Sequence, residues 1–239
     1  MKLKIESENI TPLFDTYGNF IDEAIIKLDQ KGLSSVASDR AMVCIFGVQI
    51  PKEKFDIYEV EKEEQFGVTL ATFVDILKRA GKETIEISRE GSQIVVKMGE
   101  RTFKFSPLAL TGEDIPNYEN LEFTSYFRIK SEVLLTAVAD GKLSGDTVWF
   151  ETDETSVRFS TLGDMNKNEV MLERGNQNLF EVKGKAKAQY PIDYLDKLKK
   201  VSDELVVHFS EQAPCKISFL GDSCTEGNRK GRGKRCIGV

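Results

Sequence analysis

The chain has 239 residues, of which 40% are hydrophobic and 30% charged, and its formal net charge is −6. This composition is that of an ordinary globular protein, and it argues against general disorder and against a generally basic coat for nucleic acid. No run of about 18 apolar residues is present, so no membrane span is expected. Four cysteines are too few for a disulfide scaffold, which favours a reducing, intracellular compartment.

Short helices and alternating strands follow one another in the first half of the chain. Thr11 and Pro12 have the pattern of an N-cap followed by a first-turn proline, which predicts a helix from there to about Gly18. The apolar residues of 70–77 lie on one helical face, and Gly81 marks the end of that helix. Alternation predicts strands at 1–5, 24–28, 33–37, 42–50, 84–88, 94–98 and 102–105.

The second half repeats this order of elements. A third helix is predicted from Ser131 and a fourth from Pro191, the latter with Ile192, Leu195 and Leu198 facing inward. Strands are predicted at 147–151, 157–160, 169–172, 180–189, 204–209 and 216–220. The starts at 11 and 131 differ by 120 residues, and those at 70 and 192 by 122. The sequence therefore predicts an α+β protein of two similar domains, each with two helices on curved antiparallel sheet.

The domain boundaries follow from this repeat. We expect an N-terminal domain at 1–106, a connector at 107–123, a C-terminal domain at 124–220 and an atypical tail at 221–239. The connector has two prolines, acidic residues and isolated apolar side chains, among them Leu110 and Ile115. It is either a plain linker or a docking segment for partners.

The chain offers little catalytic chemistry. Its one histidine, His208, lies in an alternating strand pattern, and the cysteines lack the close pairs of zinc sites. The glycine-rich stretch 227–235 fails as a phosphate loop, because Asn228 and Arg235 occupy the positions of the first glycine and the final Ser or Thr. We therefore expect no enzyme activity, no cofactor and no metal site.

An ordered set of segments resembles the DNA sliding clamp family, proliferating cell nuclear antigen (PCNA), in a short form more archaeal than animal. The resemblance extends from residue 1 to about 220. It rests on the segments 20–24, 32–33, 37–43, 54–58, 67–68, 76–81, 144–146, 157–160 and 194–195.

The resemblance implies a DNA-clamp fold whose subunits form a ring-shaped trimer around duplex DNA. A clamp of this kind is a processivity factor in DNA replication and repair, located in the cytoplasm or nucleoid, or in the nucleus of a eukaryote. Its implied partners are double-stranded DNA without sequence specificity, DNA polymerase, flap endonuclease, DNA ligase, the clamp loader and further copies of itself. It has no membrane partner and catalyses nothing.

The helices of a clamp line its channel, so the resemblance implies a DNA-facing set of cations. This set comprises Lys78, Arg79, Lys82, Lys197, Lys199 and Lys200. The first and third predicted helices are poor in basic residues, with Lys130 and Lys142 near the ends of the third as substitutes, so we expect weak DNA contact. The alternative is that pairs such as Asp193–Lys197 and Asp196–Lys200 only solubilise a helix.

The resemblance also implies two protein-binding surfaces. The pocket for partner peptides comprises Ser38, Met42, Val43, Leu110, Ile115 and Pro116. The subunit interface joins an edge strand near 102–105 to one near 178–182. Its apolar contacts comprise Phe103, Phe105, Leu179 and Phe180.

The tail departs from the family pattern. The repeat places a last strand near residue 224, where the sequence has no apolar alternation, and 221–239 has five basic and two acidic residues. We interpret it as a poorly ordered, non-family tail, which removes a strand from the second domain. A DNA-touching basic arm and a shifted reading frame are the alternatives.

Other functions remain open at this stage. The chain could be one subunit of a heterotrimeric clamp, or a clamp-fold scaffold for proteins that does not encircle DNA. Stable self-assembly separates the first alternative from a homotrimer, and retention on circular DNA separates the second from a true clamp.

Overall fold

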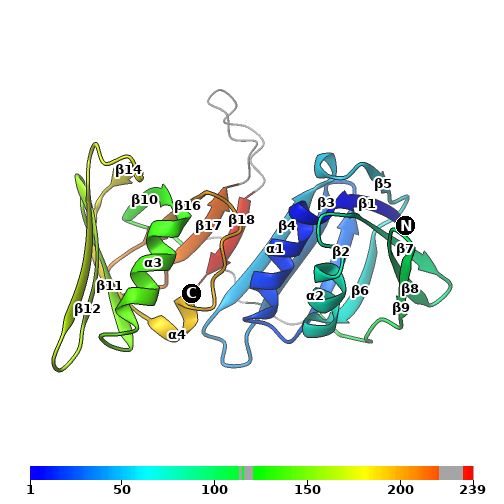
Figure 1. The fold of residues 1–239 in the computed structure, drawn as a ribbon, viewed down its shortest axis with the longest axis horizontal. Helices are drawn as coiled ribbons and strands as arrows, with labels where there is room; N and C mark the ends of the chain where they lie inside the picture. Colours follow the sequence, from blue (N-terminus) through cyan, green and yellow to red (C-terminus); the bar gives the residue numbers. More distant parts are fainter. Residues whose placement is uncertain (113–114, 116–120, 221–233, 239) are drawn as a thin grey trace. The chain divides into compact units, whose positions relative to one another are not determined.

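The computed structural model describes residues 1–112, 115, 121–220 and 234–238, the last of these for their backbone. The chain divides into two compact units, Met1–Ile115 and Pro116–Val239. Each unit combines antiparallel strands with two helices (Figure 1). The α+β class and the repeat of one fold are therefore confirmed.

Unit 1 places its helices against two groups of antiparallel strands. Its elements are β1 (Lys2–Glu6), α1 (Ser7–Gly18), β2 (Glu23–Asp29), β3 (Gly32–Ser38), β4 (Ile45–Pro51), the 3-10 turn Lys52–Lys54, β5 (Ile57–Glu59), β6 (Glu64–Thr69), α2 (Leu70–Lys78), β7 (Thr84–Glu90), β8 (Gln93–Met98) and β9 (Arg101–Phe105). Strands β5-β1-β7-β8-β9 form one sheet, and β4-β3-β2-β6 are neighbours in another. The sequence prediction missed β5 and β6.

Helix α1 begins at Ser7, so the predicted start at Thr11 is wrong and Pro12 lies inside the helix. The earlier start lets Ile10 enter the core, and the Ser7 amide donates to the carbonyl of Glu83. A proline inside a helix removes the amide that would donate to the carbonyl four residues earlier, and its ring crowds that carbonyl. Helices α1 and α2 pack closely at Gly18, where an added Cβ would lie only 3.2 Å from the Val74 side chain.

Unit 2 repeats the plan. Its elements are β10 (Ser125–Lys130), α3 (Ser131–Gly141), β11 (Thr147–Asp153), β12 (Ser156–Leu162), β13 (Lys167–Glu173), β14 (Leu179–Lys183), β15 (Lys185–Pro191), α4 (Ile192–Leu195), β16 (Glu204–Phe209), β17 (Lys216–Leu220) and β18 (Lys234–Gly238). Strands β13-β12-β11-β15 form one sheet and β14-β10-β16-β17-β18 are neighbours in another. The sequence prediction missed β10.

The core of unit 2 is built from aromatic rings. Phe150 is fully buried, with ring centroids 5.1 Å from Phe159, 5.0 Å from Tyr190, 6.1 Å from Phe127 and 6.3 Å from Phe209. Most of these pairs meet edge to face, the geometry that aromatic quadrupoles favour. This cluster holds the two strand groups of the unit together.

Two predicted elements of unit 2 differ from the structure. The strand predicted at 180–189 is divided at Gly184, whose φ is +81° and where a Cβ would lie 2.1 Å from the carbonyl oxygen of Thr124. The fourth helix ends at Leu195, and the chain continues through turn bonds such as Leu198 N to Leu195 O, 3.1 Å. Leu198 is nevertheless buried, as predicted.

The expected loss of a strand from the second domain is also wrong. Strand β18 pairs antiparallel with β17, from Lys216 opposite Gly238 to Leu220 opposite Lys234. The sequence repeat placed the last strand near residue 224, whereas the strand that pairs with β17 begins ten residues later, at Lys234. The disorder predicted for the tail, 221–239, is wrong for 234–238, which form β18, and residues 221–233 and 239 lie outside the described residues.

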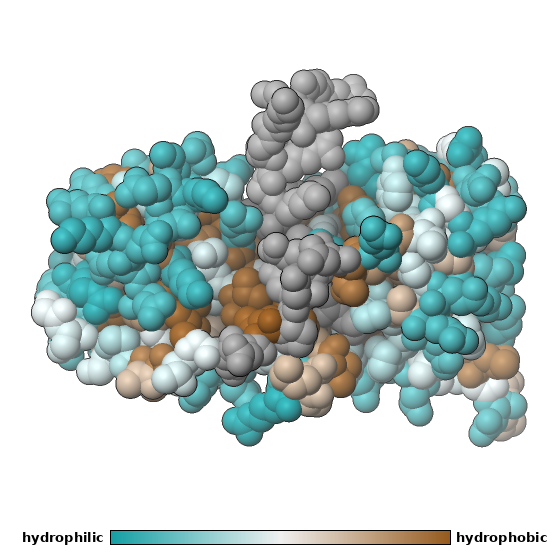
Figure 2. Space-filling view, turned by 180° about the vertical axis from the view of Figure 1, so that it is seen from behind, coloured by the Kyte–Doolittle hydropathy of each residue, from teal (hydrophilic) through white to brown (hydrophobic). Residues whose placement is uncertain are grey.

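The visible surface of both units is mainly hydrophilic. Seen from behind, polar side chains cover most of each unit and apolar residues form separate patches (Figure 2). Scattered apolar residues are normal on such a surface, so only a local group of them is informative.

Candidate DNA-facing and protein-binding surfaces

The predicted cations of unit 1 lie at the end of α2. Lys78 is in the last turn of the helix, and its Nζ is 2.7 Å from Oδ1 of Asp15 on α1. Arg79 caps the helix, and its carbonyl accepts a hydrogen bond from Arg101 at 2.6 Å. Arg79 and Lys82 form no ion pair with any described residue. Lys78 therefore links the two helices, while its neighbours point their charge at solvent.

The predicted cations of unit 2 follow α4 in an irregular segment. Lys197 lies over the ring of Tyr194, 4.9 Å from its centroid, and Lys200 is 2.8 Å from Asp203. The i,i+4 pair of Asp196 with Lys200 considered in the sequence is therefore wrong, because α4 ends at Leu195 and both residues have other partners.

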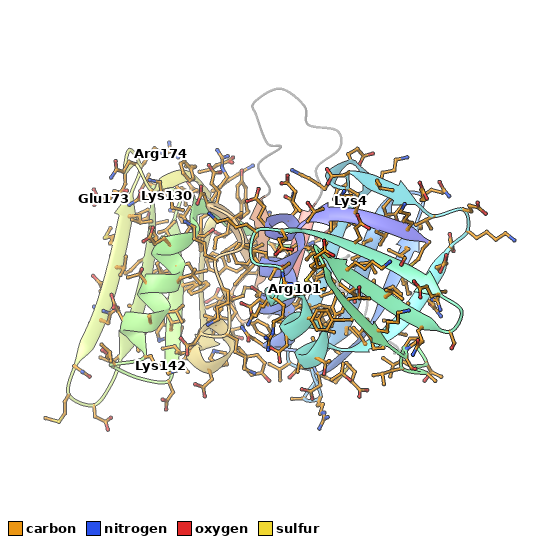
Figure 3. All side chains as sticks on the ribbon, turned by 45° about the vertical axis from the view of Figure 1, so that its right-hand side comes forward. Lys4, Arg101, Lys130, Lys142, Glu173 and Arg174 are labelled. Carbon is orange, nitrogen blue, oxygen red and sulfur yellow. The ribbon has the colours of Figure 1, made fainter. Side chains whose placement is uncertain are left out.

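Asp196 instead binds Lys142, which caps α3 at the end opposite Lys130 (Figure 3). The hydrogen bond that Lys142 donates to the Asp196 carboxylate raises the pKa of Lys142. Asp203 likewise raises the pKa of Lys200, and the pKa of Asp203 is lowered in return. Each of these shifts favours the charged form of the group that is shifted, so Lys142, Lys200 and Asp203 are charged near neutral pH.

Taken together, the helices of the two units are not positively charged. The helices with the turns that end them (7–19, 70–82, 131–142 and 192–203) contain seven lysines and arginines and eight aspartates and glutamates. The weakly basic lining of a DNA channel therefore stays a prediction. The near balance of basic and acidic residues in these four helical segments agrees with weak contact to DNA.

The predicted peptide pocket begins at the loop between β3 and β4. Asp39 Oδ1 accepts hydrogen bonds from the amides of Val43 and Cys44, both at 2.8 Å. Met42 has a φ of +55°, and its sulfur lies 3.1 Å from Oγ of Ser38. Met42 and Val43 are exposed, so this loop presents apolar side chains on a fixed backbone.

The connector residues lie elsewhere in unit 1. The Leu108 amide donates to the carbonyl of Gly67 on β6 at 2.9 Å, and the Leu110 side chain covers that glycine. β6 lies two strands away from β3. Ile115 is half-buried, and Pro116 lies outside the described residues. Leu110 is thus fixed on the sheet rather than on a loose linker.

The predicted interface residues lie on two strands. Phe103 and Phe105 are half-buried on β9, and the Phe105 ring meets Phe73 edge to face at 6.3 Å. Beside it is a hollow of about 120 Å³ whose lining includes Thr72, Phe73, Ile76, Phe105 and Leu108. On β14, Leu179 is buried, while Phe180 is exposed under the guanidinium of Arg128.

Sequence reasoning missed a second edge strand in unit 2. In the described part of the chain, β13 has a neighbour, β12, on one side only, and the two pair over seven residues from Ser156–Glu173 to Leu162–Lys167. By contrast, the pairing of β14 with β10 shifts register between Arg128 and Ile129. The alternation of β13 was legible in the sequence, but its position at a sheet edge was not.

An exposed apolar group adjoins β13. Leu143, Leu162 and Met165, here called the apolar tip, are 80%, 74% and 98% exposed. Their loops are joined by backbone contacts: Asn166 donates to the carbonyl of Leu143, and a Cβ at Gly163 would lie 1.8 Å from the carbonyl oxygen of Ser144. Such a group on packed loops is typical of an interaction surface.

Other kinds of site find no support in the described residues. No group of three or more His, Cys, Asp or Glu side chains there is placed to hold a metal ion. No helix in the same part of the chain is long and apolar enough to cross a membrane. His208 lies in β16 and stacks on Tyr126 at 5.4 Å, in line with the strand position predicted for it.

Comparisons with known proteins agree with this architecture. The family model described as proliferating cell nuclear antigen, N-terminal domain, matches residues 3–100. A DNA polymerase sliding clamp of Thermococcus fumicolans is 31% identical, with 90% of each chain covered. DNA polymerase sliding clamp 3 of Sulfurisphaera tokodaii is also 31% identical, with 92% of this chain and 93% of the relative covered.

Solved structures show the same fold. A chain from the PCNA2–PCNA3 complex of Sulfolobus tokodaii matches with a TM-score of 0.87 and 24% identity, over 100% of this chain and 98% of that one. The PCNA of A. fulgidus, solved with the C-terminal region of FEN-1, matches with a TM-score of 0.85 and 23% identity, over 99% and 95%. Together with the two-unit fold, the identity to these relatives over nine-tenths of the chain establishes that it belongs to the PCNA family of DNA polymerase sliding clamps.

Proposed function

We propose that this chain is a DNA polymerase processivity factor, a clamp that encircles duplex DNA and tethers replication and repair enzymes. The observation that supports this most is the repeated clamp fold over the whole chain in a member of the sliding clamp family. The role is one of binding and topology rather than catalysis.

A ring that encloses DNA needs no tight DNA site. Its topology prevents escape, and a few cations facing the phosphates are enough to allow sliding. The acidic net charge of −6 suits such a ring, because an acidic exterior discourages binding of DNA from the side. Lys78, Arg79, Lys82, Lys197, Lys199 and Lys200 are the proposed contacts.

Protein partners are proposed to bind unit 1 through short peptides. The exposed Met42 and Val43 and the sheet-bound Leu110 offer apolar contacts, with Ser38 adding a hydroxyl. The PCNA of A. fulgidus is solved with the C-terminal region of FEN-1, so a flap endonuclease tail is a suitable first probe.

Subunits are proposed to join through β9 of one chain and an edge strand of unit 2 of the next. The sequence-based choice of β14, with Leu179 and Phe180, stays a prediction. β13 is the better candidate, because its pairing with β12 is regular and the apolar tip adjoins it. Its Glu169 and Glu173 are opposite in charge to Arg101 and Lys104 of β9, and contact across subunits would compete with the ion pairs that Glu169, Arg101 and Lys104 form within the chain.

Two measurements test this function. Light scattering should give a mass near three times 26.9 kDa, and the protein should be retained on closed circular DNA and released when that DNA is cut. A stable monomer that forms a ring only with a second clamp chain would favour the heterotrimer subunit, a reading that the PCNA2–PCNA3 neighbour supports. A trimer with no preference for circular DNA would mean a protein-binding scaffold.

A further inference from the structure

Three of the cations on the helical surface have an aspartate partner within their own unit. Lys78 binds Asp15, Lys142 binds Asp196, and Lys200 binds Asp203. Two of these pairs join separate elements: α1 with α2 in unit 1, and the end of α3 with the segment after α4 in unit 2. The lysine heads are about half exposed, so they can still reach a phosphate if the carboxylate releases them.

We propose that Asp15, Asp196 and Asp203 are attenuating residues, which hold the DNA-facing lysines and weaken their contact with phosphate. A phosphate must compete with the carboxylate for the same ammonium group. Each contact between lysine and phosphate therefore adds less binding free energy than the contact of an unpaired lysine would. The inference rests on the proposed function, because it takes the helical surface to face DNA.

The three aspartates should differ in strength. Asp15 is 30% exposed, Asp196 38% and Asp203 84%. Water screens an exposed pair more than a partly buried one. Asp15 should therefore hold its lysine most firmly and Asp203 least, and release of Lys78 should have the largest effect.

The surface also contains a matched control. Asp75 lies on the exposed side of α2, one turn before Lys78, and forms no ion pair with a described residue. The substitutions Asp15→Asn and Asp75→Asn change the net charge equally on adjacent helices. Any difference between them reports the release of Lys78 rather than the general charge.

The test measures binding of a fluorescent duplex by anisotropy over about 25 to 200 mM salt. Asp15→Asn should raise affinity about two- to fivefold, the strength of an exposed ion pair. It should also steepen the dependence of log K on log salt by up to about 0.9, the effect of one added phosphate contact. Asp75→Asn should leave that slope unchanged.

Two further variants separate this role from a structural one. In a Lys78→Gln background, Asp15→Asn should give no gain, since there is no ammonium to release. Asp15→Glu, which keeps the carboxylate, should restore weak binding. Thermal unfolding of all variants should stay close to wild type, because the Lys78 side chain is half exposed and such pairs contribute little to stability.

The inference is overturned if Asp15→Asn and Asp75→Asn behave alike, if neither binds DNA, or if the gain persists without Lys78. The proposed function fails on a different result, namely that the wild-type protein is not retained on closed circular DNA. The two failures are therefore distinguishable.

Discussion

Gly67→Ala should detach the start of the connector from unit 1. A Cβ at this position would lie 2.6 Å from the carbonyl oxygen of Leu108 and 2.9 Å from Cγ of Leu110. Real Cβ atoms do not approach a backbone oxygen so closely, and the backbone at 108 cannot rotate away as a side chain could. The 107–110 segment must therefore move off β6.

The cost follows from what that movement breaks. The bond from the Leu108 amide to the Gly67 carbonyl is worth about 1 kcal/mol. Exposing the half-buried Leu108 and Leu110 costs up to about 1 kcal/mol each. Alanine has a lower conformational entropy than glycine in the unfolded chain, and this offsets about 0.4–1 kcal/mol of the loss in stability. A net loss of up to about 2 kcal/mol is expected, confined largely to this segment.

Amide hydrogen exchange measures the effect where it occurs. The Leu108 amide should lose most of its protection in Gly67→Ala, and a probe peptide should bind more weakly because Leu110 is displaced. Gly112→Ala is the matched control, since a Cβ there meets nothing within 4 Å. Unchanged protection of Leu108 in Gly67→Ala would refute the steric argument.

Three further substitutions test other parts of the chain. Phe150→Ala should destabilise unit 2 by about 3–5 kcal/mol in denaturant unfolding, because it leaves a cavity among four rings, whereas Phe180→Ala at the exposed edge should cost far less. Met42→Gly should relieve a positive φ, so that stability is unchanged or raised by less than about 1 kcal/mol. Titration with a probe peptide should show weaker binding, because an apolar contact is lost. A loss of stability would contradict the argument from φ. Hydrogen bonds from Ser156 and Thr155 lower the pKa of Asp153 to about 2, so its ionised form stabilises the fold above about pH 4 and that stability is lost as pH falls toward 2. Asp153→Asn should remove about 1 kcal/mol of stability at neutral pH. In acid titrations the difference in stability between variant and wild type should vanish near pH 2. A difference that stays constant with pH would show that the charge is not the cause.

Periodicity predicted most of the fold because side chains that alternate or recur every third or fourth residue must bury one face. It failed where a local backbone event decided the outcome. Gly184 divides a continuous alternating run because the chain passes close to Thr124, and nothing in the alternation reveals that approach. Pro12 looked like a helix start, but burial of Ile10 outweighed the proline's preference.

The candidate site was predictable only as a list of cations. Their partners were not, because Asp15 and Lys78 are 63 residues apart and Lys142 and Asp196 are 54 apart. The local rule of i,i+4 pairing gave the wrong partner for Lys200, since α4 ends after one turn and Lys200 pairs with Asp203. Likewise, alternation identified β13 as a strand, but only the sheet order makes it an edge.

The exposure of the apolar tip makes one of its side chains susceptible to oxidation. Met165 is almost wholly solvent-exposed, so its thioether is open to peroxide, and conversion to the sulfoxide would make this apolar side chain polar. The subunit surface proposed at β13 would then lose one of the three apolar side chains of the tip without any change in sequence. Preparations that age differently should differ in assembly, and the mass of one added oxygen would identify the cause.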